Sequence, residues 1–212
     1  TIVLAIAAVP ASAQDRLCDP GNEDCRAILL SYIRNETVGI DVGFWFMEDA
    51  RYTNELILKW KAGVPVRVLV DTRANATNLH NAARLAELKD AGIPMRERFT
   101  GGILHWKMML FAGQRTVQFS GGNYSPHAFT PESPYTNYVD EAIFFTEDAA
   151  IVQSFMRRFD DLWINTTTYA NYANISGTPK RSYPTYAIAP ELNFPPAASY
   201  RDRAVTAYNA ET

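Results

Sequence analysis

The chain has 212 residues, of which 47% are hydrophobic and 20% are charged, a composition typical of a globular protein with one substantial core. Its net charge is -3 and its pI is about 5.6. The overall charge is therefore not that of a broadly basic nucleic-acid-binding protein. A local basic groove stays open, and one domain is the default expectation.

The first 13 residues form a short apolar run that ends in Ala11-Ser12-Ala13. This pattern is typical of a signal-peptide core and cleavage site, and the run is too short to span a bilayer. We therefore interpret residues 1–13 as the remainder of a signal peptide cleaved after Ala13, and expect a secreted or periplasmic protein. The alternative is an apolar first strand or helix of the domain.

Residues 14–23 are expected to be a short cysteine-containing segment ahead of the domain. Cys18 and Cys25 are the two cysteines of the chain, and they flank a polar loop. An oxidising compartment allows them to form a disulfide, and two free thiols are the alternative. Two cysteines do not provide a metal-binding set, so no metal site is expected here.

Helical and strand patterns alternate between residues 24 and 98. Apolar stripes and capping residues predict helices over 24–35, from Glu48-Asp49 to Gly63, and over 79–91. Runs rich in Val, Ile and aromatic residues predict strands over 37–47 and 66–70, with a short one over 95–98. The β-α-β spacing favours parallel strands joined by right-handed crossovers.

The next strand is predicted over residues 103–111, and period 2 divides it into two faces. One face carries His105, Lys107, Met109 and Phe111, and the other carries only apolar residues. A buried strand rarely holds a lysine without a partner, so an anion-binding pocket at this end of the strand explains the pair. The alternative is a satisfied core histidine beside a lysine that extends to the surface.

Two turns and a strand follow. Residues 112–115 are predicted to form a tight turn, 116–119 a paired strand, and 120–125 a bend of small residues that contains Asn123. The proline-containing segment 124–137 is a candidate specificity loop. His127 lies in this loop, and we interpret it as incidental rather than as a second proton donor.

A strand over residues 138–145 carries Asp140 and Glu141, which alternate to opposite faces. One carboxylate should therefore point inward, and the one that faces His105 should raise the pKa of this histidine. The alternative is that both acids are exposed edge charges.

Thr146 is the predicted N-cap of a long helix with an apolar stripe from Ile151 to Trp163.

The stretch from His105 to Asn123, with the segments around it over residues 24–164, resembles the phospholipase D superfamily. The motif of that superfamily is H-x-K-x-x-x-x-D, followed by a G-S-x-N element. Two positions depart from the motif, because Ala112 replaces the aspartate and the amide element is Ser-Gly-Gly-Asn. The resemblance implies an α/β fold over residues 24–175, with a mixed, largely parallel sheet and helices on both faces.

The resemblance also implies a chemistry that needs no metal and no other cofactor. His105 would be the motif histidine, with one histidine acting as nucleophile through a phosphohistidine and a second histidine, from a paired motif, acting as general acid. Lys107, Asn123 and Ser120 would bind the phosphate. Glu141 would accept a hydrogen bond from His105 and hold its tautomer.

Residues 176–212 are interpreted as a proline-rich linker and the start of a second domain that is truncated at Thr212. Five of the 12 prolines lie between Pro179 and Pro196, and a weak helical pattern covers 200–210. The sequence contains no second H-x-K, so the partner motif is expected in a missing second half of the chain or in a homodimer partner. The fragment alone is expected to be nearly inactive.

Three functions fit these observations. The first is a phospholipase D-like phosphodiesterase that hydrolyses or exchanges the head group of a phospholipid, for which an apolar rim should surround the site. The second is a nuclease of the same superfamily, which needs a positive groove and binding that depends strongly on salt. The third is a non-catalytic phosphate-binding domain, which Ala112 and the shifted Asn123 favour.

Overall fold

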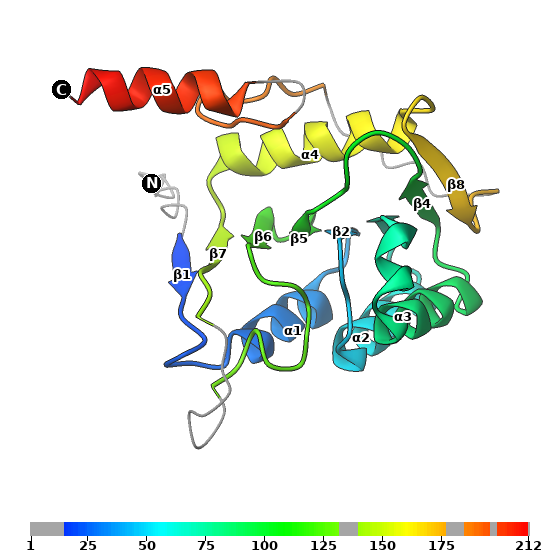
Figure 1. Ribbon diagram of the computed structural model, residues 1–212. Coiled ribbons are helices and arrows are strands. Elements are labelled where there is room, and N and C mark those ends of the chain that lie inside the picture. Colours follow the sequence, from blue (N-terminus) through cyan, green and yellow to red (C-terminus); the bar gives the residue numbers. More distant parts are fainter. Residues whose placement is uncertain (1–14, 132–139, 177–184, 196–198, 212) are drawn as a thin grey trace, which may run out of the picture.

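The computed structural model describes residues 15–131, 140–176, 185–195 and 199–211. Within these residues the chain forms an eight-stranded mixed sheet in the order β1-β7-β6-β5-β2-β3-β4-β8 (Figure 1). The strands are β1 (Arg16–Cys18), β2 (Ile40–Phe44), β3 (Val66–Val70), β4 (Met95–Arg98), β5 (Lys107–Phe111), β6 (Thr116–Ser120), β7 (Ile143–Thr146) and β8 (Tyr169–Ala173).

Helices cover both faces of this sheet, as predicted (Figure 1). The helices are α1 (Cys25–Asn35), α2 (Ala50–Lys61), α3 (Leu79–Asp90), α4 (Ala149–Ile164) and α5 (Tyr200–Ala210), with a 3-10 helix over Thr72–Ala76. One core lies between the sheet and α1 to α3, and a second lies between the sheet and α4. Arg67 of β3 helps to hold α4, because it pairs with Asp41 of β2 and Asp160 of α4, each at 2.8 Å.

Side-chain caps set the helix starts. The side chains of Asp24, Asp49 and Asn78 accept backbone N–H groups from the first turns of α1, α2 and α3. Thr146 is not the cap of α4, as the sequence had indicated, because it pairs in β7. Asp148 takes this position, and its carboxylate accepts the N–H of Ile151 at 2.9 Å.

The sheet is mixed, but the expectation that it is largely parallel was wrong. Among the described residues the parallel pairs are β2–β3 and β3–β4, the crossovers predicted from the β-α-β spacing. The pairs β1–β7, β7–β6, β6–β5, β5–β2 and β4–β8 are antiparallel. A parallel neighbour needs a long crossover, and a tight turn joins β5 to β6.

Strand β5 has the two faces that its period predicts. Met109 and Phe111 pack in the core under α1 to α3, and Met108 and Leu110 pack in the core under α4. The strand begins at Lys107, so residues 103–106, which were predicted as strand, form a loop that leads into it. Side chains therefore alternate between the two faces over Lys107–Phe111, where the strand is paired with β2 on one side and β6 on the other.

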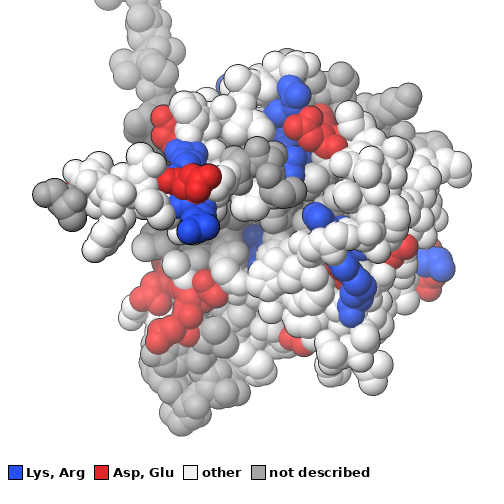
Figure 2. Space-filling model, turned by 45° about the horizontal axis from the view of Figure 1, so that its top comes forward, with Lys and Arg blue, Asp and Glu red and all other residues white. Residues whose placement is uncertain are grey.

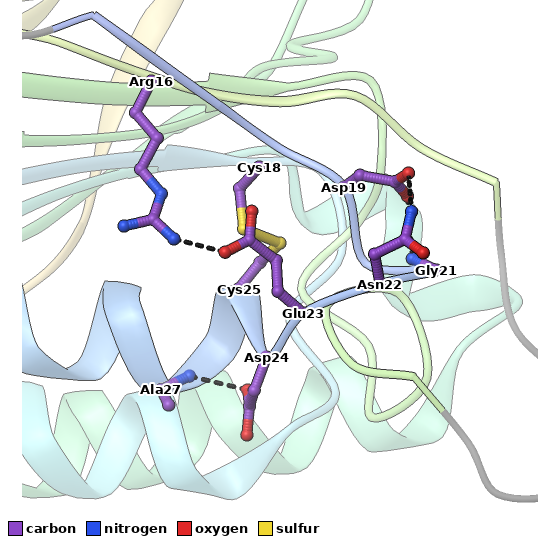
Figure 3. Close-up of a disulfide and its surroundings, with 9 residues drawn as sticks. All are labelled: Arg16, Cys18, Asp19, Gly21, Asn22, Glu23, Asp24, Cys25 and Ala27. Atoms are coloured by element: carbon purple, nitrogen blue, oxygen red, sulfur yellow. Dashed lines mark hydrogen bonds and ion pairs between the residues drawn. A yellow bond between two sulfur atoms is a disulfide. The ribbon is translucent and has the colours of Figure 1, made fainter.

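Strand β1 was not predicted and lies in the segment that was expected to precede the domain. It pairs with β7 at one edge of the sheet, and Cys18 at its end forms a disulfide with Cys25 at the start of α1 (Figure 3). Both cysteines are fully buried. The neighbouring loop is tied by an ion pair between Arg16 and Glu23. The disulfide thus joins the sheet edge to the first helix.

Part of the predicted linker packs on the domain. Phe194 is buried against Phe155 of α4 and against Trp106, and the Ala189 N–H donates to the Ser154 hydroxyl of α4 at 2.8 Å. Helix α5 has no buried residue within the described part of the chain, in agreement with its weak apolar pattern. No helix among the described residues combines the length and apolar character needed to cross a bilayer.

Candidate active site

The predicted site residues gather at one edge of the sheet. Lys107 at the start of β5 pairs with Phe44 at the end of β2, and Ser120 at the end of β6 pairs with Ile143 at the start of β7. Antiparallel pairing therefore brings together the residues before β5, after β6 and before β7. These segments carry His105, Asn123 and Glu141.

His105 and Lys107 are in direct contact. The Lys107 Nζ atom lies 2.9 Å from each ring nitrogen of His105 and donates to the His105 backbone carbonyl at 3.2 Å. Only 3% of Lys107 is exposed, whereas His105 is exposed. An ammonium group can donate to the imidazole only when one ring nitrogen carries a lone pair, so this contact requires a neutral ring.

The pKa shifts of the pair favour this state. Burial lowers the pKa of Lys107 to about 8, and the Glu141 carboxylate acts in the opposite direction. Burial of part of the ring, and then the charge of Lys107, lower the pKa of His105 below its usual value. The expectation that a facing carboxylate raises the pKa of His105 was therefore wrong, because the ammonium of Lys107 is the charge in contact with the ring.

Glu141 lies in the site, next to the glycine bend that precedes Asn123. A Cβ atom at Gly122 would be 2.8 Å from the Glu141 Oε2 atom, and one at Gly121 would be 3.0 Å from Oε1. These two positions therefore leave the space that the carboxylate occupies. The Glu141 Oε1 atom accepts the N–H of Ala142 at 3.0 Å.

The predicted hydrogen bond from His105 to Glu141 is not formed among the described contacts. The His105 ring contacts Lys107 instead, and Glu141 acts on Lys107 through its charge. The orienting role of Glu141 therefore stays a prediction. Asp140, the other candidate carboxylate, is exposed.

Asn123 and Ser120 have different surroundings. The Oδ1 atom of Asn123 is buried and has no hydrogen-bond partner within the described residues. A buried carbonyl oxygen without a donor is costly, whereas the amide NH2 group of the same side chain is a donor that suits a phosphate oxygen. The Ser120 hydroxyl donates to the Gly122 carbonyl at 3.1 Å, so it stabilises the bend.

Several neighbours of the site were missed in the sequence. The indole ring of Trp45 lies 6.1 Å from the His105 ring, and the backbone N–H of Trp45 donates to the Trp106 carbonyl at 3.0 Å. No spacing signal linked Trp45 to His105, because they lie beside neighbouring strands far apart in the sequence. Conversely, Tyr124 and Phe129 of the predicted specificity loop are fully buried in the core, and residues 132–137 of this loop lie outside the described residues.

Ala112 begins the turn that joins β5 and β6, where the motif has its aspartate. This turn is held by Glu36, a fully buried residue at the end of α1. Its carboxylate accepts the backbone N–H groups of Gly113 at 2.9 Å and Gln114 at 3.2 Å, and those of residues 37–39. A carboxylate therefore supports this turn although the motif position lacks one.

Metal ligands do not gather at this site. Among the described residues, the one group of three potential ligands within reach of a single ion is Cys18, Glu23 and Cys25. The two cysteines are joined in the disulfide, so they do not offer thiolates.

The comparisons with known proteins identify the family of this chain. Residues 29–163 match the family described as "Cardiolipin synthase, PLD-like domain". A comparison with curated protein sequences finds no match. The family match supports a function on phosphodiesters, with the reaction of a hydrolase or a transferase.

Solved structures share the fold. The phospholipase D family member Nuc from Salmonella typhimurium has a TM-score of 0.63 and 20% identity, covering 76% of this chain and 99% of its own. NucT from Helicobacter pylori has a TM-score of 0.63 and 14% identity, with coverage of 76% and 100%. Phosphatidylserine synthase from Haemophilus influenzae has a TM-score of 0.58 and 18% identity, with coverage of 79% and 40%. The chain belongs to the phospholipase D superfamily, within the family of PLD-like domains described as cardiolipin synthase.

Proposed function

We propose that this protein cleaves or transfers phosphodiesters through a phosphohistidine formed on His105, with no metal required. The observation that carries the proposal is the contact between the nearly buried Lys107 ammonium and the His105 ring, 2.9 Å apart. This arrangement favours the neutral imidazole, whose lone-pair nitrogen attacks phosphorus when the bound phosphate takes the Lys107 ammonium in place of the ring. A neutral histidine with a lowered pKa is in its reactive form at neutral pH.

The reaction proceeds in two balanced steps. A His105 nitrogen forms a bond to phosphorus while the bond from phosphorus to the leaving oxygen breaks, and a second histidine protonates that oxygen. Water or an alcohol then attacks phosphorus, gives its proton to the second histidine, and releases His105. Lys107 and Asn123 stabilise the charge on the phosphoryl oxygens, and such electrostatic stabilisation usually contributes more to catalysis than any other single effect.

The second histidine is proposed to come from another copy of the motif. The sequence has no second H-x-K, so the copy belongs to a homodimer partner or to a further part of the same chain. Nuc, whose chain is matched over 99% of its length, supports the view that one such unit is a complete fold.

We also propose a secreted or periplasmic location, which the buried disulfide supports.

A phospholipid head group is the proposed substrate. Apolar side chains border the loop that leads to His105, since Phe99 and Ile103 are each 51% exposed and Trp45 and Phe46 are half-buried. These side chains suit an amphipathic ligand whose phosphate enters the site and whose acyl chains stay outside. The description of the matched family, cardiolipin synthase, supports the same substrate class.

A nuclease is the second candidate, and one local feature favours it. Arg98 lies beside the Gly101 bend, and its charge acts on Arg158 together with that of Asp161. Neither arginine forms an ion pair among the described residues. On the face drawn in Figure 2, however, basic side chains lie in small groups, several of which also contain acidic side chains. Long nucleic-acid strands bind to continuous basic surfaces, so this feature ranks below the apolar rim.

The test compares the protein with H105A and with H80A, a control variant of an exposed histidine on α3. The substrates are a chromogenic phosphodiester, a phosphatidylcholine dispersion and single-stranded DNA, each with a chelator present. We expect turnover of the lipid by the protein and by H80A, no turnover by H105A, and an acid-labile phosphate on the parent after rapid quenching. Equal turnover by H105A and the parent would refute the proposal, and cleavage of DNA alone would select the nuclease.

A further inference from the structure

The loop before His105 is fixed by a pair of residues that follow β3. The Arg73 guanidinium donates to the backbone carbonyls of Gly101 at 3.3 Å and Gly102 at 2.9 Å. The Asp71 carboxylate accepts the backbone N–H of Leu104 at 3.0 Å. Three backbone groups within four residues are therefore held from one point, and the last of them is adjacent to His105.

Asp71 and Arg73 also hold each other. Arg73 donates to the Asp71 carboxylate through Nε at 2.8 Å and through Nη2 at 2.5 Å. Asp71 is fully buried, whereas 41% of the Arg73 side chain is exposed. A two-pronged contact between a guanidinium and a carboxylate is rigid. Because the pair directly follows β3, it holds the loop in a fixed position relative to this strand.

The other side of His105 is anchored separately. The Trp106 carbonyl accepts a hydrogen bond from the backbone N–H of Trp45 at 3.0 Å, and Lys107 begins β5 beside Phe44. His105 itself lies between these two anchors and is exposed. The Phe99 N–H donates to the Thr168 carbonyl at 3.1 Å and Leu104 is buried, so loss of the first anchor frees mainly residues 100–103. The backbone that leads into His105 then loses its hydrogen bonds, and the ring can shift.

We infer that Asp71 and Arg73 are positioning residues of the active site, which fix the backbone of residues 101–104 and thereby the attacking ring of His105. This inference rests on the proposed function. Neither residue needs to touch the substrate. Their loss should therefore lower kcat and leave KM unchanged, because a nucleophile displaced by about 1 Å reacts about 10²-fold more slowly.

A second pair in the chain provides a matched control. Asp49 and Arg51 repeat the local chemistry at the start of α2, with the Asp49 carboxylate accepting the Arg51 N–H at 3.0 Å and Nε at 2.7 Å. The Arg51 side chain donates to Asp49, and within the described residues it donates to no loop of the site. R51Q and R73Q each remove a contact between an arginine and the aspartate two residues before it, through one prong for Arg51 and two for Arg73, but only R73Q releases the loop.

The experiment measures kcat and KM on the phosphodiester turned over by the parent, for R73Q, R73K, D71N and R51Q. Hydrogen exchange at the Leu104 amide is measured in the same four variants. We expect R73Q to lower kcat by about 10²-fold, with unchanged KM and faster exchange at Leu104, and R51Q to match the parent. R73K should not restore kcat, because an ammonium keeps the charge but cannot bridge two carbonyls and a carboxylate as the planar guanidinium does.

The possible outcomes separate the roles of Arg73. Equal kcat in R73Q and R51Q would overturn the inference, and so would full rescue by R73K, because that result would assign a purely electrostatic role to Arg73. A raised KM would assign Arg73 to substrate binding and would overturn it as well. If the parent turns over no substrate, the proposed function fails, and unchanged exchange at Leu104 in R73Q would then separately refute the fixing of the loop.

Discussion

Lys107 determines the electrostatics of the site, because its ammonium is nearly buried beside the His105 ring and is influenced by Glu141. The reaction needs a neutral His105 to attack and a charged Lys107 to bind the phosphate. These two requirements set opposite limits on pH. The lowered pKa of His105 sets the acid limit, and the pKa of Lys107 of about 8 sets the alkaline limit.

The pH dependence of kcat/KM is therefore expected to be bell-shaped, since this ratio reports the free enzyme. Activity should rise through a pKa below 6.5, where His105 loses its proton, and fall at higher pH, where the second histidine loses the proton that it donates and Lys107, with a pKa of about 8, loses its charge. The measurement is the initial rate at low substrate concentration between pH 5 and pH 10, values chosen to span the ordinary pKa of both groups. A profile that still rises above pH 9 would contradict this assignment of Lys107.

E141Q should move the alkaline limb of this profile to lower pH. The carboxylate of Glu141 raises the pKa of Lys107 against the effect of burial, so its neutralisation allows burial to lower the pKa further. The measurement is the same kcat/KM profile for the variant and the parent. An alkaline limb at unchanged pH would show that Glu141 does not act on Lys107.

G122A tests the packing between the bend and Glu141. The new Cβ atom would lie 2.8 Å from Oε2 and 2.9 Å from Cγ of Glu141, so the whole side chain must move away. We expect kcat to fall and the melting temperature to fall with it, because Gly122 is buried and the displaced side chain must be accommodated. A variant with unchanged kcat would show that the position of Glu141 is unimportant.

At the scale of elements, the turn between β5 and β6 shows how a missing motif residue is compensated. Ala112 provides no carboxylate, but Glu36 at the end of α1 binds the N–H groups of the turn. Burial alone would raise the pKa of Glu36, but the backbone hydrogen bonds outweigh it and hold the pKa below its usual value. This balance gives the turn a dependence on pH that can be measured.

E36Q should lower the free energy of unfolding by about 1–3 kcal/mol at pH 7, because it leaves buried N–H groups poorly paired. The folded pKa of Glu36 is lowered, so its stabilisation is fully present above the unfolded value of about 4.3 and is lost as the pH falls through the folded pKa. Urea unfolding at pH 7 and at about pH 3 measures both parts. The difference between parent and variant should shrink at the lower pH, and a constant difference would contradict the ionic role.

At the scale of the whole molecule, the two edge strands of the sheet are β1 and β8, which lie outside the β-α-β part. Strand β8 covers β4, and β1 covers β7 with the disulfide to α1 behind it. Such edges are otherwise open to pairing with other chains. The covalent link makes the stability of the β1 edge dependent on the redox state of its surroundings.

Replacement of both cysteines by serine, C18S/C25S, should destabilise the protein by about 2–3 kcal/mol, as expected for a short closed loop. The reduced parent should behave like the variant, and addition of a reductant to the variant should have no effect. Urea unfolding with and without the reductant measures both. Equal stability of the oxidised and reduced parent would show that the disulfide does not hold the edge strand.

The sequence by itself determined most of the elements, although not β1 or β8, and it drew attention to the central pair of the site. Capping residues and apolar periods located α1, α2, α3 and α5 within one or two residues, because such signals are local. The alternation of β5 assigned Met109 and Phe111 to one core and Met108 and Leu110 to the other, and the small residues after β6 placed Asn123 in a bend. Both follow from the fixed period of a strand and from the backbone freedom of glycine.

Only the tertiary structure decided which distant residues support that pair. The pairing of β2 with β5 brought Trp45 to His105, the end of β3 brought Asp71 and Arg73 to the loop at Gly101, and α1 brought Glu36 to the turn. Whether neighbouring strands run parallel or antiparallel was likewise decided by which strands pair, and no local sequence pattern indicates that. These contacts depend on the order of the strands, which is set when both faces of the sheet are buried together. Each contact joins residues far apart in the sequence, so no local pattern shows which two residues meet.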